Sequence, residues 1–87
     1  MMVGQKVKVS LPQLPRNHIG IRFDDSQGAA AAVSAPRGAS GEVLNLSPDR
    51  SEALIELYWS GATRAAPGSG QVWRIWVKRV FFGQLFD

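Results

Sequence analysis

Hydrophobic and polar residues alternate over several short stretches of this chain, which is the pattern of half-buried β-strands. Apolar residues recur at every second position within residues 4–11, 53–59 and 72–77, and residues 42–46 hold a shorter run. A further apolar segment covers residues 81–86. We predict one strand in each of these five segments.

Residues 47–59 allow two interpretations. Ser47 followed by Pro48 is typical of a helix start, and the apolar residues at 53, 54, 57 and 58 have helical spacing. The same residues also alternate, and the second half of the run is β-branched or aromatic. We favour a hairpin, with Pro48 and Asp49 in a tight turn between two strands.

Between the first two predicted strands lies a long excursion, residues 12–40. Two prolines at its start end the first strand, because proline has no amide hydrogen for a sheet. Residues 17–24 alternate briefly and predict a short strand inside a longer loop. Residues 25–41 are rich in Gly, Ala and Ser and predict a mobile loop, and residues 61–70 predict a second loop.

The alternation also assigns a buried face to each strand. The residues predicted to fill the core are Val7, Ile55, Leu57, Trp73 and Ile75. Five strands in an open sheet would leave two apolar edges exposed, so we expect a closed or partly closed barrel.

The order of these segments resembles the SH3-like small β-barrels. The run GEVLNL and the pattern WV-x-x-VFFGQL, whose final strand would be Phe81–Phe86, carry the resemblance. Such barrels have a first strand, a long irregular excursion, a three-stranded meander and a last short strand. The resemblance implies that residues 1–87 form one all-β domain, a five-stranded SH3-like small barrel with a long irregular loop after the first strand.

The composition is that of a small soluble domain. The 87 residues are 45% hydrophobic and 20% charged, which argues against disorder of the whole chain. Without cysteine there is no disulfide scaffold and no cysteine-ligated zinc site, and a single histidine argues against a histidine site. No stretch approaches the roughly 20 apolar residues of a membrane span. We therefore expect no membrane partner, and the simplest compartment is the cytoplasm.

Charge is distributed unevenly along the chain. The formal charge is +4 over residues 1–23, −4 over residues 24–60 and +3 over residues 61–87. If the two basic ends meet in space, the fold has a basic side and an acidic side.

No set of residues predicts catalysis. The single His18 lies in a proline-bounded loop without a nucleophile beside it, and a triad needs one. Asp24 and Asp25 are adjacent and suit a turn better than an acid–base pair. A glycine-rich phosphate loop followed by lysine is also missing. We expect no enzyme activity, no cofactor and no metal.

One surface is a candidate binding site. If the predicted core faces inward, the outward residues include Tyr58, Arg74, Trp76, Lys78 and Arg79. Exposed aromatic rings beside cations serve both protein interfaces and the stacking of nucleic-acid bases. We expect a small non-catalytic binding or assembly module with a protein partner. A nucleic-acid-binding barrel is the alternative, and burial of Trp76 under the long excursion would remove the surface.

The apolar segment after Arg79 bears on assembly. Its large apolar residues are Val80, Phe81, Phe82, Leu85 and Phe86. One side of a short strand cannot bury them all, so either the core takes both faces of this segment or another subunit covers some of these residues. This segment favours a homo-oligomer.

Overall fold

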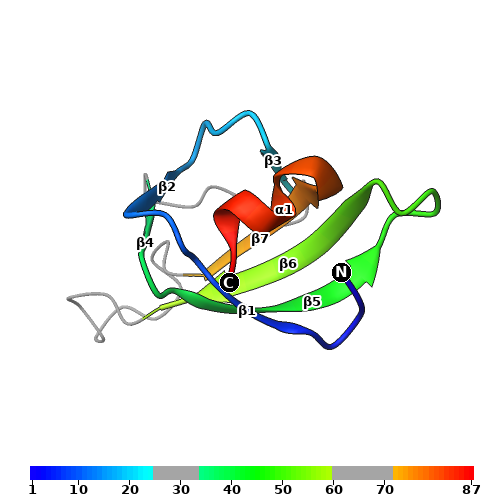
Figure 1. The fold of residues 1–87 in the computed structure, drawn as a ribbon, viewed down its shortest axis with the longest axis horizontal. Helices are drawn as coiled ribbons and strands as arrows, with labels where there is room; N and C mark the ends of the chain where they lie inside the picture. The colour runs from blue at the N-terminus through cyan, green and yellow to red at the C-terminus, as the bar shows by residue number, and fades with distance from the viewer. Residues whose placement is uncertain (25–33, 60–71) are drawn as a thin grey trace.

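A five-stranded antiparallel sheet with the strand order β1-β5-β6-β7-β3 dominates the fold (Figure 1). The computed structural model describes residues 1–24, 34–59 and 72–87. The strands of this sheet are β1 (Lys6–Lys8), β3 (Ile21–Phe23), β5 (Ser40–Leu46), β6 (Glu52–Tyr58) and β7 (Val72–Lys78). The other elements are the paired strands β2 (Gln13–Pro15) and β4 (Ser34–Pro36) and the helix α1 (Arg79–Leu85). The described chain is therefore all-β apart from one short helix.

The segments predicted as central strands form the meander β5, β6 and β7. Ile55 in β6 lies opposite Val43 in β5 and Ile75 in β7, so the three strands share an apolar face. The predicted hairpin over residues 47–59 is confirmed, and the helix alternative is wrong.

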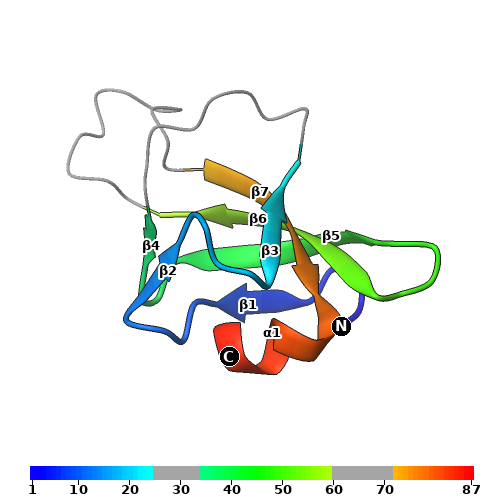
Figure 2. The ribbon, with the colours of Figure 1, turned by 90° about the horizontal axis from the view of Figure 1, so that it is seen from above.

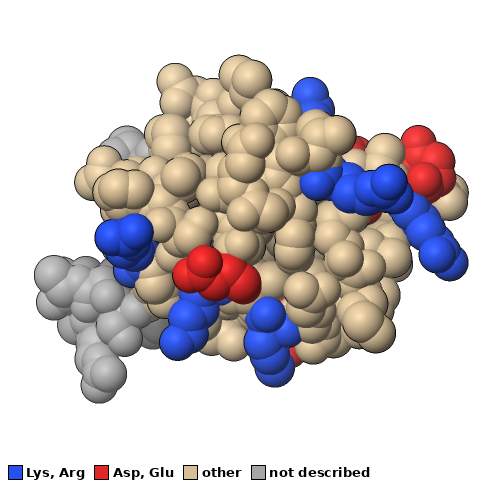
Figure 3. All heavy atoms as spheres, in the orientation of Figure 1, with Lys and Arg blue, Asp and Glu red and all other residues tan. Residues whose placement is uncertain are grey.

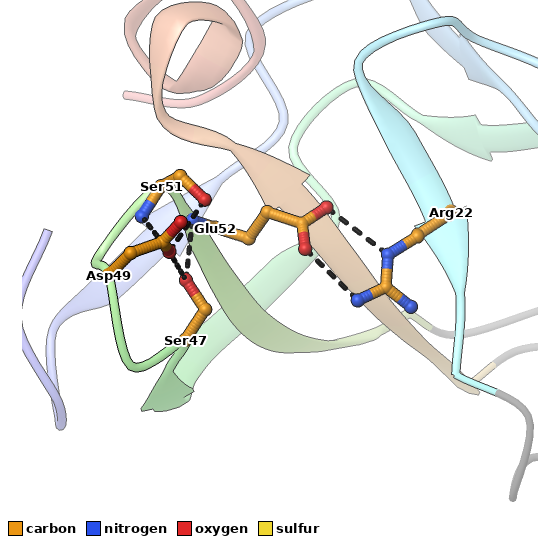
Figure 4. A network of polar contacts seen from close by, with 5 residues as sticks. All are labelled: Arg22, Ser47, Asp49, Ser51 and Glu52. Carbon is orange, nitrogen blue, oxygen red and sulfur yellow. Dashed lines mark hydrogen bonds and ion pairs between the residues drawn. The ribbon is translucent and has the colours of Figure 1, made fainter.

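The turn between β5 and β6 explains why the hairpin forms. The hydroxyl groups of Ser47 and Ser51 each donate to one carboxylate oxygen of Asp49 at 2.8 Å, and the Ser51 amide donates to it at 3.0 Å (Figure 4). The Ser47 hydroxyl also accepts a hydrogen bond from the amide of Glu52. The side chain that could have capped a helix therefore closes the turn, in which Arg50 adopts a left-handed φ of 60°.

The core lies on the inner side of the main sheet. The five residues predicted to be buried are buried: Val7, Ile55, Leu57, Trp73 and Ile75. Leu14 of β2 and Ala35 of β4 are also fully buried, so the two-stranded sheet covers part of the same core. The main sheet coils, and β3 lies above β5 and β6 when seen from above (Figure 2).

The main sheet is not closed into a barrel among the described residues. Its edges are β1 and β3, and the fifth strand is β3 instead of the predicted Phe81–Phe86. The first strand is shorter than the predicted 4–11. An isolated bridge between Val9 and Phe86 places the end of the described chain beside β1. Of the two predicted forms, closed or partly closed, the closed barrel is therefore wrong for these residues.

The predicted strand over 81–86 is replaced by α1. The apolar residues at 81, 82 and 85 are spaced so that they share one helical face, whereas a strand would have split them between two faces. Phe86 follows the helix with an extended backbone. Leu85 and Phe86 are buried, and Phe81 and Phe82 are half-buried against the core. A helix thus buries most of a segment that one side of a strand could not have buried.

The excursion contains more order than the sequence predicted. It includes β2, β3 and β4, and the predicted short strand at 17–24 is narrowed to Ile21–Phe23. The proline residues of β2 and β4 are tolerated because these strands form only a two-stranded sheet. The loop predicted at 61–70, and most of that at 25–41, lies outside the described residues. No helix in the described ranges has the length and apolar character that crossing a membrane needs.

Candidate functional site

The five residues predicted to form a binding surface do not form one site. They are distributed over β6, β7 and the start of α1. In the pairing of β6 with β7, Tyr58 lies opposite Val72 and Lys78 lies opposite Glu52. These two pairs are at opposite ends of the strands, roughly 20 Å apart at about 3.3 Å per residue. Arg74 and Trp76 lie between them, and Arg79 begins α1. The predicted surface therefore divides into parts that can be considered separately.

Arg74 belongs to a row of charges across the sheet. Its guanidinium forms an ion pair with Glu56 at 3.0 Å, and Glu56 lies opposite Glu42 in β5. Glu42 in turn forms an ion pair with Lys6 of β1, and this hydrogen bond raises the pKa of Lys6. The charge of Arg74 therefore has a local neutralising partner, because the sheet register places an acid beside it.

Trp76 is half-buried, and β3 of the excursion lies beside it. Arg22 is the cross-strand neighbour of Trp76, and its guanidinium lies over the Trp76 ring at 5.3 Å from the ring centroid. Two hydrogen bonds of 3.2 and 3.0 Å hold that guanidinium to Glu52 (Figure 4). The excursion therefore covers Trp76 in part, and a ligand would have to displace Arg22 to stack on this ring.

The same contacts argue against the expected division into a basic and an acidic side. Each of the three described ion pairs joins a cation from a basic end of the chain to an acid from its middle. The pairs are Lys6–Glu42, Arg22–Glu52 and Arg74–Glu56. These pairs cancel part of the uneven charge of the sequence across the strands of the sheet.

Lys78 and Arg79 have a different environment. Together with Arg50 they line a surface pocket of about 520 Å³ between the β5–β6 turn and the junction of β7 with α1. The remaining lining residues are Asp49, Ser51, Glu52 and Val80. The amide of Arg79 donates to the carbonyl of Ser51 at 2.8 Å, which joins the two walls of the pocket. We call this feature the basic pocket.

The acids that line the basic pocket form no ion pair with Arg50, Lys78 or Arg79 among the described residues. Asp49 accepts hydrogen bonds from Ser51 and Ser47, which lower its pKa to about 2, and Glu52 is paired with Arg22. In the described part of the chain, no ion pair involves the remaining lining cations, which are Arg50, Lys78 and Arg79. Figure 3 shows Lys and Arg side chains gathered at the end of the molecule where the β5–β6 turn lies, with acids beside them.

Sequence reasoning missed Arg50 as a member of this site. It was counted only as one charge in the acidic middle of the chain. A signal was present, because strands predicted at 53–59 and 72–77 pair antiparallel if they are neighbours. In an antiparallel pair, the turn that precedes the strand at 53–59 must lie beside the residues that follow the strand at 72–77. That register brings Arg50 to the side of Lys78 and Arg79.

An apolar patch adjoins the basic pocket. Val80 lines the pocket and is 78% exposed, and Ile19 is 74% exposed. Gly20, next to Ile19 in the chain, packs so closely on Phe81, next to Val80, that a Cβ atom at residue 20 would lie 2.7 Å from the ring. His18 meets the same ring edge-on at a centroid distance of 5.6 Å. We call Ile19, Val80 and Phe81 the apolar patch. The centre of the face that holds α1 carries few charges (Figure 3).

Neither His18 nor the described acids form a recognisable catalytic or metal site. The Nδ1 atom of His18 accepts a hydrogen bond from the Gly20 amide at 2.9 Å, so this nitrogen supports the loop. No cluster of three potential metal ligands occurs within the described ranges. Comparisons with protein-family models, curated proteins and solved structures gave no match.

Proposed function

We propose that this chain is a small non-catalytic binding or assembly module that acts through protein–protein contacts. The observation that carries the proposal is the apolar patch beside the basic pocket. Val80 and Ile19 are large apolar side chains with most of their surface exposed. Arginine and aromatic residues are enriched in protein interfaces, and Arg50, Arg79 and the half-buried Phe81 lie at this surface. Contiguous exposed apolar surface marks interaction sites, and the packing of Gly20 on Phe81 brings the segments that hold Ile19 and Val80 together.

The alternative, a nucleic-acid-binding barrel, has less support. A nucleic-acid surface needs cations that follow the phosphate backbone and exposed rings on which bases stack. Three of the described cations, Lys6, Arg22 and Arg74, are paired with acids. Trp76 is partly covered by Arg22, and the exposed Tyr58 lies at the opposite end of β6 from the basic pocket. These features favour a protein partner.

The finer fold assignment, an SH3-like arrangement, is also part of this proposal. Its support is the element order: a first strand, a long excursion, the meander β5–β7 and a helical turn before Phe86. The bridge from Phe86 to Val9 returns the chain to β1. An open sheet with this order is what we expect of such a barrel without complete closure.

Assembly with a second copy is one form of this proposal, and binding of a different protein is the other. Two copies related by a two-fold axis through the apolar patch would place equal charges near each other, because Arg79 directly precedes Val80. We therefore favour a different protein as the partner.

Site-specific photo-crosslinking tests the proposed function. A photoreactive residue would replace Val80, and a matched variant would carry it at Val72, which is exposed at the far end of β7. We expect a discrete protein adduct from position 80 in cells of the source organism and none from position 72. An adduct between two copies would assign the patch to self-association. An adduct with nucleic acid alone, or equal adducts from both positions, would contradict the proposal.

A further inference from the structure

We infer that the basic pocket binds an acidic side chain of the partner, whose neighbouring apolar side chain packs on Val80 of the apolar patch. The inference rests on the proposed function and names the chemistry of the ligand. It uses the three cations that line the pocket, Arg50, Lys78 and Arg79, and the exposed side chain next to them.

The backbone on both sides of the pocket is held in place. The amide of Arg79 bonds to the Ser51 carbonyl at 2.8 Å, and the amide of Lys78 bonds to the Gly20 carbonyl at 2.9 Å. The Arg50 amide bonds to the Ser47 carbonyl at 2.8 Å within the closed turn. The backbone that carries the three cations is therefore fixed, so a ligand has to order only their side chains.

The acids of the pocket are turned toward other partners. Figure 4 shows the Asp49 carboxylate directed at Ser47 and Ser51, and the Glu52 carboxylate directed at Arg22. A carboxylate from outside could thus approach the pocket cations without displacing an existing ion pair. Arginine binds a carboxylate through two parallel hydrogen bonds, which are stronger than those between neutral groups.

The surface beside the pocket selects a peptide over a phosphate chain. Val80 both lines the pocket and is exposed, and the outward residues that follow on α1, Gly83 and Gln84, are uncharged. A nucleic acid leaving the pocket across α1 would bring further phosphates onto uncharged surface. A peptide can instead place one acid in the pocket and an apolar side chain on Val80. We therefore assign an acidic peptide segment with an adjacent apolar residue.

Two randomised peptide libraries provide the test. They differ only at one fixed position, which is glutamate in the first and glutamine in the second, and apolar residues flank that position in both. We expect the whole protein to select binders from the glutamate library only. Replacing Arg79 by Gln should weaken their binding roughly tenfold or more, since a lost charge-assisted hydrogen bond has an effect of this size. Lys8→Gln makes the same charge change on β1 and should leave binding unchanged.

The outcomes separate this inference from the proposed function. Equal selection from both libraries, with binding that is sensitive to Val80→Ser but not to Arg79→Gln, would overturn the acidic ligand and leave the protein-binding module. Selection from neither library would overturn the inference, and loss of the crosslink at position 80 would overturn the proposed function. Stronger binding of a phosphoserine peptide or a single-stranded oligonucleotide in competition would assign the pocket to phosphate. An equal loss in Lys8→Gln would mean that only net charge matters and would also overturn the inference.

Discussion

Two regions of the molecule hold the same kinds of residue, but these residues differ in whether they have partners. The regions are the outer face of β6 and β7 and the basic pocket at the end of these strands. Arg74 on the outer face is paired with Glu56, whereas Lys78 and Arg79 have no ion-pair partner among the residues described. The difference follows from position. Within a sheet, each outward side chain has a cross-strand neighbour that can carry the opposite charge. Lys78 still faces Glu52 across the strands, but Arg22 holds that carboxylate, and Arg79 lies beyond the last residue pair of β6 and β7.

The same contrast applies to the apolar groups. Trp76 has a neighbouring strand and is covered by Arg22, which Glu52 holds in place. Val80 lies one residue beyond the two cations and is exposed. A residue type that suggests binding, such as Trp or Arg, is therefore less informative than its place relative to the sheet register. The functional surface is to be sought where paired strands stop.

The largest effect should come from removing Trp76. Trp76→Ala deletes a half-buried ring and its contact with Arg22, and we expect unfolding in urea to become easier by about 2–3 kcal/mol. That is less than the cost of a fully buried tryptophan. Binding of the selected acidic peptide should not change. Arg79→Gln should weaken peptide binding and change the free energy of unfolding by no more than about 0.5 kcal/mol. Loss of peptide binding in a folded Trp76→Ala variant would contradict the claim that the outer face supports stability and the basic pocket supports binding.

A somewhat smaller effect should follow from crowding the contact beneath the apolar patch. Gly20→Ala would place a Cβ atom 2.7 Å from the Phe81 ring, so α1 must shift, at a cost of about 1–3 kcal/mol. Gly83→Ala is the matched control, because nothing lies within 4 Å of its Cβ position and alanine favours helix. We expect this control to raise thermal stability slightly. Equal stabilities for the two variants would show that residues 18–20 do not hold α1.

Part of this arrangement could be predicted from the sequence. The alternation over 53–59 and 72–77 predicts the strands and their buried faces because its period is local. The helix at 79–85 was missed because a short apolar run fits either a helix or a strand, and only the spacing of Phe81, Phe82 and Leu85 distinguishes them.

Other features depend on contacts between residues far apart in the chain. Pairing of β3 with β7 determines that Arg22 covers Trp76, and no local pattern specifies that pairing. The basic pocket likewise requires the turn that contains Arg50 to lie beside the start of α1. These parts of the candidate site could not be read from residue types alone.

The smallest effect concerns Asp49, which supports the turn that carries Arg50. Hydrogen bonds from Ser51 and Ser47 lower its pKa from 3.8 to about 2, so the folded protein favours the charged form. The stabilisation is present above pH 3.8 and is lost as the pH falls toward 2. Asp49→Asn should therefore be less stable than the original protein at neutral pH and equal to it near pH 2 in urea denaturation. A difference that is independent of pH would contradict this role.

The most direct test of where this protein binds is a map of backbone amide shifts on addition of a peptide selected from the glutamate library. We expect the shifts to gather at Arg50, Arg79 and Val80, around the basic pocket and the adjoining apolar patch. The amide shifts of Tyr58 and Arg74 should not change, because charged side chains on the outer face already have partners within the sheet. Shifts centred on Tyr58 and Arg74, with the pocket unaffected, would contradict the assignment of the binding surface to the strand ends.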